Sequence, residues 1–165
     1  MDKDFDIIFL KSKGFIPKAI RYFTKCEYNH VGIIHMYQEE LYVFEAVSRG
    51  FIPTSTLEDW KLEKEVKGEK WCIISPNIRV TAIEKIKKSN RIKELTGKKY
   101  EFVSLLFYQL IYQISKKWIG SKNNNRVICS EAVAYVYKEC FEDWYKTDPQ
   151  DIYDSPSFTK TSCNQ

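Results

Sequence analysis

The two histidines of the chain lie five residues apart in one short apolar segment, CEYNHVGIIHM. A general base that works near neutral pH is usually an imidazole, so His30 and His35 are the candidates for that role. On a β-strand, an odd separation points two side chains to opposite faces. At most one of the two imidazoles can therefore face any given site.

Glu45 provides a criterion for choosing between them. The runs HVGIIHM and LYVFEAV predict a hairpin with a two-residue loop at 38–39, which places Gly32 opposite Glu45. His30 then lies on the same face as Glu45, diagonally across the strands and within side-chain reach. A four-residue loop gives the same result, whereas a three-residue loop would separate the pair. The alternative is that Glu45 lies on the solvent-facing side of an edge strand.

Cys129 is the candidate nucleophile. The segment RVICSEAVAYVYKEC predicts a helix over 129–141 that begins at this cysteine and carries Glu131 in its first turn. A helix N-terminus stabilises a thiolate and can also bind a developing oxyanion. The alternative is a packing role, because Cys129 shares a helical stripe with Val133 and Val136 and buried free cysteines are common in cores.

The five cysteines form an odd set without a C-x-x-C pair, which suggests reduced thiols rather than a disulfide framework or a zinc ribbon. Cys26, Cys72 and Cys140 are interpreted as packing residues, and Cys163 falls in a polar tail. A zinc site at Cys26 and His30 is a further hypothesis, but it would have only two neighbouring ligands.

Length and composition indicate one globular domain over residues 1–165. The formal charge of +4 reflects an excess of basic residues in 79–99, which favours the solvated face of a helix. A surface for anionic lipid or nucleic acid is the alternative. No aromatic residues interleave with these charges, so nucleic-acid binding is not expected.

The start of the chain, MDKDFDIIFLKSKG, lacks the basic region and long apolar stretch of a signal peptide. The apolar tract 102–114 is interrupted by Gln109 and Gln113 and falls short of the roughly 20 residues that span a bilayer. We therefore expect a cytoplasmic protein without stable membrane insertion.

Strands are expected in the first half of the chain and helices in the second, which is typical of an α+β domain with an antiparallel sheet. The expected strands are at 6–10, 30–36, 41–47 and 70–75, with a further extended run after Gly50; the expected helices are near 16–23, after Thr56, and at 80–95, 102–117 and 129–141. The tail DPQDIYDSPSFTKTSCNQ is predicted to be loop-like and to fray after Phe158.

Five segments, in order, resemble the permuted papain-like hydrolases of the NlpC superfamily, specifically its YiiX-like branch. They are DIIFL, AIRYFTKCEYNHVGI, VFEAV, GKKYEF and VICSEAVAYVY, and together they extend over nearly the whole chain. The resemblance implies a circularly permuted papain-like fold, a sheet or barrel packed against helices, in which the histidine precedes the cysteine. The chain departs from the pattern at Phe5, where the family usually has glycine, and at Asn29, where it usually has serine.

The same resemblance implies His30 as base, Glu45 as orienting acid and Cys129 as nucleophile. It also implies that Tyr100 of GKKYEF and Ser130 of CSEA contribute to oxyanion or substrate binding. The expected activity is hydrolysis of an amide bond through a thioester, without a cofactor or metal. The expected substrate is a small peptide, a muropeptide or an N-acylated amino compound.

Two other functions remain open on the same residues. A lipid-directed thiol acyltransferase or phospholipase would pass the acyl group from Cys129 to an acceptor other than water, or would take it from a lipid. A catalytically silent binding module would keep the fold alone. The oligomeric state is not indicated by the sequence.

Overall fold

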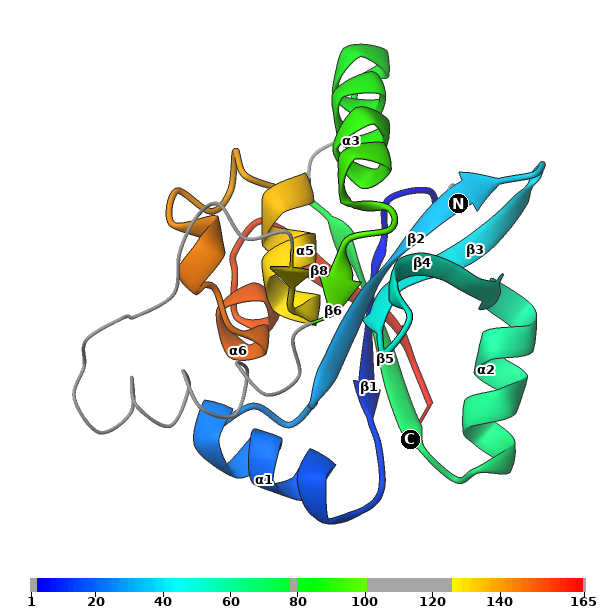
Figure 1. The fold of residues 1–165 in the computed structure, drawn as a ribbon, viewed down its shortest axis with the longest axis vertical. Coiled ribbons are helices and arrows are strands. Elements are labelled where there is room, and N and C mark those ends of the chain that lie inside the picture. Colours follow the sequence, from blue (N-terminus) through cyan, green and yellow to red (C-terminus); the bar gives the residue numbers. More distant parts are fainter. Residues whose placement is uncertain (1–2, 78–79, 101–125, 165) are drawn as a thin grey trace.

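A computed structural model describes residues 3–77, 80–100 and 126–164 of the chain. The helix expected at 102–117 lies outside these residues. Within them the protein is an α+β fold, as the order of strands and helices predicts, and six strands form one antiparallel sheet (Figure 1).

The strands of this sheet lie in the spatial order β4-β3-β2-β1-β5-β8. Their bounds are β1 Ile7–Lys11, β2 His30–Tyr37, β3 Glu40–Val47, β4 Gly50–Thr56, β5 Lys70–Pro76 and β8 Phe158–Cys163. A short parallel pair, β6 Lys99–Tyr100 and β7 Arg126–Val127, lies against β3 and β4. The helices are α1 Phe15–Thr24, α2 Leu57–Val66, α3 Ala82–Leu95, α5 Cys129–Val136 and α6 Pro149–Tyr153, with a 3-10 turn at Trp144–Lys146.

The sheet separates two hydrophobic cores, with α5 and α6 on one side and α2 on the other (Figure 1). Neighbouring residues of β2 belong to different cores, because side chains alternate along a strand. Ile33 belongs to the core that contains Val133 of α5, whereas Ile34 belongs to the core that contains Trp60 of α2. The position of a residue along β2 therefore decides which of the two cores its side chain joins.

The predicted hairpin is confirmed, with the predicted register. Gln38 and Glu39 form the loop with φ of 51° and 68°, the left-handed conformation that a two-residue hairpin turn of this kind requires. Gly32 pairs with Glu45. A Cβ atom on Gly32 would lie 2.9 Å from the carbonyl oxygen of Phe44, so the close approach of the two strands requires glycine here.

The expected helix starts after Thr56 and near residue 80 are confirmed by their capping interactions. The Thr56 hydroxyl accepts a hydrogen bond from the backbone N–H of Asp59, and Thr81 and Glu84 form a reciprocal capping box at the start of α3. Both helices are thus fixed by local signals that the sequence carries.

Part of the basic excess of α3 has a structural role. The Lys88 side chain is only 4% exposed and donates to Glu139, while Arg91 donates to Glu139 and to the carbonyl of Val136. Burial is the main cause of the lowered pKa of Lys88, although the Glu139 carboxylate opposes it. These two basic residues tie α3 to the end of α5.

The helix expected at 129–141 ends five residues early, at Val136. Tyr137 leaves the helix with φ −105° and ψ 34°, and its buried hydroxyl donates to the backbone carbonyl of Phe5. Cys140 is consequently exposed instead of continuing the apolar stripe. A tertiary hydrogen bond to the start of the chain outweighs helix propensity at this point.

The prediction of a loop-like, fraying tail is wrong. Asp148 caps α6, and β8 pairs antiparallel with β5 in the main sheet. The side chains of β8 are mostly polar and exposed because it is an edge strand, so its sequence lacks the apolar pattern that identifies buried strands.

The interpretation of all cysteines as reduced is also wrong, because Cys72 of β5 and Cys163 of β8 form a disulfide. They are directly opposite each other in the strand register. Cys26, Cys129 and Cys140 are free. Sequence spacing could not indicate the bond, since the two residues are 91 positions apart and meet only through the sheet.

None of the helices in the described ranges combines the length and apolar character needed to cross a lipid bilayer. The apolar tract 102–114 lies outside those ranges.

We expect loss of the disulfide to lower the free energy of unfolding by about 2 to 4 kcal/mol, because the bond closes a long loop in the unfolded chain. Denaturant unfolding of Cys163→Ser and of the reduced parent protein should show this loss. Cys140→Ser, which removes an exposed free thiol, should leave stability unchanged. Unreduced, denatured protein should contain three titratable thiols. A count of five would show that Cys72 and Cys163 are not joined.

Candidate active site

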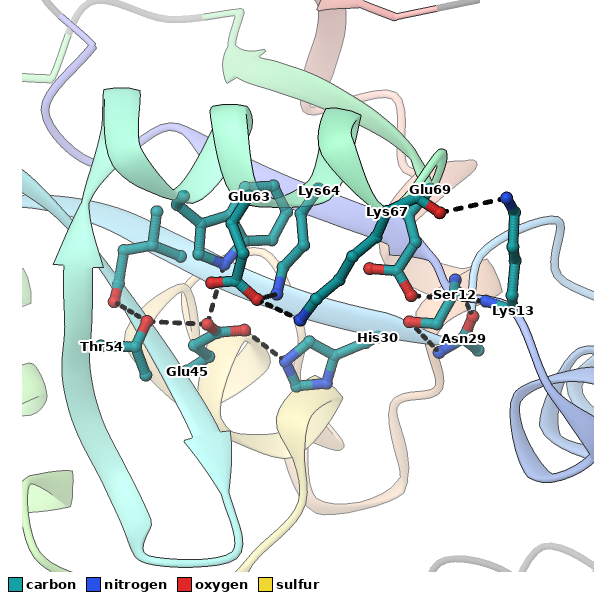
Figure 2. A network of polar contacts seen from close by, with 12 residues as sticks. Ser12, Lys13, Asn29, His30, Glu45, Thr54, Glu63, Lys64, Lys67 and Glu69 are labelled. Carbon is teal, nitrogen blue, oxygen red and sulfur yellow. Dashed lines mark hydrogen bonds and ion pairs between the residues drawn. The ribbon is translucent and has the colours of Figure 1, made fainter.

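A buried pair of His30 and Glu45 forms the centre of the site. His30 is the first residue of β2, and its Nε2 lies 2.7 Å from Oε2 of Glu45 on the neighbouring strand (Figure 2). The two side chains are 15% and 7% exposed. Since β3 is an interior strand and Glu45 is buried, the alternative of a solvent-facing edge position does not apply.

The second oxygen of Glu45 accepts two further hydrogen bonds. Oε1 lies 2.7 Å from the Thr54 hydroxyl and 2.8 Å from the indole Nε1 of Trp60. Burial by itself would raise the pKa of Glu45. The hydrogen bond and positive charge of His30, together with the two donors to Oε1, lower it to about 2. Glu45 is therefore an ionised acceptor at neutral pH.

Cys129 lies at the first position of α5 and is 1% exposed. The helix begins there because the backbone N–H of Ile128 is capped by the Glu131 carboxylate, at 3.3 Å. Figure 2 shows α5, in yellow, beginning beside the imidazole of His30. Cys129 interacts with His30 and contributes to a raised pKa of the imidazole.

The electrostatics of His30 reflect both neighbours. Burial would lower its pKa, but the hydrogen bonds and charges of Cys129 and Glu45 outweigh it and raise the pKa to about 10. An imidazole held in its protonated form between a thiol and a carboxylate can stabilise a thiolate. The structure thus brings together three residues from β2, β3 and α5 in an arrangement suited to nucleophilic catalysis.

No family model matches the chain. Its sequence is 30% identical over 133 residues to the uncharacterized protein YiiX of Escherichia coli strain K12, a match that covers 81% of this chain. The chain is similar to YiiX. The match covers 56% of the relative's length, so this chain spans little more than half of that protein.

The fold is similar as well. A crystal structure described as that of metalloprotein YiiX from Escherichia coli O157:H7 has a TM-score of 0.62 and 22% sequence identity to this chain. The alignment covers 98% of this chain and 97% of the crystallised one. At this identity the likeness shows the fold alone.

The donor groups around His30 do not make up a metal-ligand set within the described residues. The residues that the structure describes contain no group of three or more His, Cys, Asp or Glu placed to hold a metal ion. Cys129 and His30 supply two donors, while both oxygens of Glu45 are already engaged. The zinc hypothesis for Cys26 and His30 likewise gains no third donor, and burial raises the pKa of the Cys26 thiol to about 11.

Ser130 and Tyr100 are placed differently by the structure. Ser130 is fully buried as the second residue of α5, and its hydroxyl has no hydrogen-bond partner among the described residues. The backbone of Tyr100 pairs with Val127 in the β6–β7 ladder, just before Cys129. The Tyr100 side chain lies outside what the structure describes.

His35 is separated from the site, as strand parity predicts. Its Nδ1 lies 2.8 Å from Oδ1 of Asp4, and its ring packs against Phe5 at 4.8 Å and Phe44 at 5.7 Å between centroids. It therefore lies with the α5-side core residues rather than with Glu45.

The two departures from the NlpC-type pattern have structural explanations. Phe5 has φ 73°, a left-handed conformation that favours glycine; its amide donates to the carbonyl of Ile34, and its side chain is fully buried. Asn29 accepts hydrogen bonds from the backbone N–H of Ser12 at 2.7 Å and from Arg21 at 2.9 Å. Asn29 thereby fixes the start of β2 to β1 and α1.

Thr54 and Trp60 were not identified from the sequence. Thr54 lies at a bulge, since Phe44 pairs with Pro53 and Val43 pairs with Ser55, which leaves Thr54 without a strand partner. A proline inside a strand is a known sign of such a bulge and could have drawn attention to this position. No comparable signal distinguishes Trp60 from an ordinary core aromatic residue.

Replacing Glu45 with Gln should reduce the loss of stability in acid. The pKa of Glu45 falls from an ordinary 4.5 to about 2 on folding, so its ionised form stabilises the fold above about pH 4.5. That contribution, on the order of 3 kcal/mol, is lost as the pH falls toward 2. Urea unfolding between about pH 5 and pH 2 should therefore show a shallower decline for Glu45→Gln than for the parent.

Glu58→Gln is the matched control, because the Glu58 side chain is 80% exposed. Its stability should decline in parallel with that of the parent protein. A parallel decline of Glu45→Gln would contradict the stabilising role of the ionised Glu45.

Proposed function

We propose that this chain is a circularly permuted papain-like cysteine hydrolase that cleaves an amide bond through a thioester on Cys129. His30 acts as the base and Glu45 as the orienting acid. The observation that carries the proposal is the buried His30–Glu45 pair, 2.7 Å apart, whose imidazole also interacts with a cysteine at a helix N-terminus.

In the first half-reaction the Cys129 thiolate attacks the carbonyl carbon and the C=O electron pair moves to the oxygen. The first backbone N–H groups of a helix have no intrahelical acceptor, and we assign that of Cys129 as the oxyanion donor. The Ser130 hydroxyl, without a partner in the described part of the chain, and the Tyr100 hydroxyl are further proposed donors. As the C–N bond breaks, protonated His30 gives its proton to the leaving amine.

In the second half-reaction neutral His30 takes a proton from water, and the hydroxide attacks the thioester. Collapse of that intermediate releases the carboxylic acid and restores the thiolate beside imidazolium. Glu45 stabilises the imidazolium and orients the ring in both halves. The proposed substrates are small peptides, muropeptides or N-acylated amino compounds.

The test is detection by intact mass of an acyl adduct on Cys129 after incubation with muropeptides, N-acyl amino compounds and lipids. Adduct formation and release to water with an amide substrate support the proposal. Transfer to an amine or alcohol acceptor, or an adduct from lipid only, would indicate the acyltransferase or phospholipase instead. Loss of activity on treatment with a chelator, restored by zinc, would contradict a metal-independent mechanism.

We expect Cys129→Ala to fold normally but to lose both the adduct and turnover, because no other residue replaces the attacking sulfur. His30→Gln should reduce turnover by at least about a hundredfold, the scale of general acid–base catalysis. His35→Gln is the matched control, since it changes the other histidine of the same strand and should retain near-parent turnover. Retained activity in Cys129→Ala would contradict the assignment.

A further inference from the structure

Glu45 is held by two residues that take no part in the proposed reaction. Trp60 from α2 and Thr54 from β4 both approach Oε1, at 2.8 Å and 2.7 Å, on the opposite side of the carboxylate from His30. Figure 2 shows His30 and Thr54 on the two sides of Glu45. Their hydrogen-bonding groups determine whether Glu45 is ionised and which ring nitrogen of His30 carries a proton.

The indole N–H of Trp60 can only donate, so Oε1 of Glu45 must accept. The single hydroxyl hydrogen of Thr54 has two acceptors in reach, the carbonyl of Val43 at 3.1 Å and Glu45 at 2.7 Å, and the shorter contact is to the carboxylate. Donors to one carboxylate oxygen favour the ionised form. An ionised Glu45 can only accept at Oε2 as well, so the proton between it and His30 belongs to Nε2.

This assignment determines the other ring nitrogen. With Nε2 committed to Glu45, Nδ1 is the nitrogen of His30 left for Cys129. A carboxylate free to rotate or to take up a proton would not hold this arrangement, because His30 could then change tautomer or ring orientation.

The two donors are themselves rigid. Trp60 is 1% exposed, and it is one of only two buried residues of α2, the other being Leu57. Its indole packs in the α2-side core, so the position of the N–H is set by the docking of the helix. Thr54 is fixed by the bulge in β4. Neither donor can follow Glu45 if the carboxylate swings away.

We propose that Trp60 and Thr54 are positioning residues, which hold Glu45 ionised and in one orientation so that His30 keeps its Nε2 proton and presents Nδ1 to Cys129. The inference deepens the proposed cysteine hydrolase function and rests on it for its catalytic meaning. The hydrogen-bond arrangement can nevertheless be tested without any substrate.

The first experiment compares Trp60→Phe with Trp71→Phe. Both substitutions replace a buried indole in the same core, but the Trp71 Nε1 has no hydrogen-bond partner among the described residues. The readout is the rate of Cys129 alkylation by iodoacetamide against pH, followed by peptide mass. A Cys140→Ser background removes the exposed thiol, and the raised pKa of buried Cys26 keeps that thiol slow.

We expect the midpoint of the alkylation profile to move upward by about one pH unit in Trp60→Phe and to stay in place in Trp71→Phe. The reason is that a less firmly held Glu45 stabilises the imidazolium less, which in turn stabilises the thiolate less. Thr54→Val should shift the midpoint in the same direction, and Thr54→Ser, which keeps the hydroxyl, should restore it. Equal midpoints for the two tryptophan variants would overturn the proposal.

The second experiment reads the tautomer directly. The chain has only two histidines, so ¹⁵N-labelled side chains give two sets of NMR signals, and His35 is an internal reference. In the parent protein we expect the neutral ring of His30 to carry its proton on Nε2. The Trp60→Phe, Thr54→Val double variant should lose this tautomer or show a mixture of the two. Trp71→Phe should keep it. The same signature in all variants would overturn the proposal.

The two readouts distinguish this inference from the proposed function. If Cys129 reacts near pH 6 no faster than free cysteine, while the tautomer of His30 depends on Trp60 and Thr54, the nucleophile assignment fails and the positioning of His30 stands. If Cys129 is highly reactive but neither readout responds to Trp60 or Thr54, the hydrolase assignment survives and the positioning role does not.

Discussion

The hydrogen bond between Glu45 and His30 is the interaction on which the site depends. A buried carboxylate such as that of Glu45 is strongly destabilising unless its charge is matched by donors. Here the donors come from three different elements: His30 from β2, Thr54 from β4 and Trp60 from α2. An error in the placement of any one of them would leave a buried charge partly unpaired, so the carboxylate couples the three elements to one another.

This requirement accounts for several local features that otherwise look unrelated. Gly32 lets β2 and β3 approach closely enough for the register that pairs it with Glu45. The bulge at Thr54 interrupts the β3–β4 ladder where a hydroxyl is needed. The Thr56 cap begins α2 directly after β4, and the indole of Trp60 follows in the first turns of that helix.

The site also lies where the two cores of the molecule meet. Cys129 belongs to the core on the α5 side of the sheet, whereas Trp60 belongs to the core on the α2 side. His30 is the first residue of β2, and the Glu45 carboxylate that it contacts also accepts a hydrogen bond from Trp60. The fold as a whole is similar to that of YiiX, and in this chain Phe5 and Asn29 are both held by hydrogen bonds that involve the segments around β1 and β2.

The sequence by itself determined what depends on short-range periodicity and chemistry. Strand parity and a two-residue loop are enough to pair His30 with Glu45 and to turn His35 away, because side-chain direction alternates with every residue. The Thr56 cap placed α2, and the C-S-E segment placed a cysteine at the start of a helix.

Tertiary structure alone decided the interactions between distant segments. Just after the end of α5, Tyr137 donates a hydrogen bond to the start of the chain. The last strand, β8, pairs with β5 and is joined to it by a disulfide. Thr54 and Trp60 donate to Glu45 only because the bulge in β4 and the docking of α2 bring them to the carboxylate. Apart from Pro53, which marks the bulge at Thr54, these features have no sequence signal of their own, because their stabilising partners are brought near only by the fold.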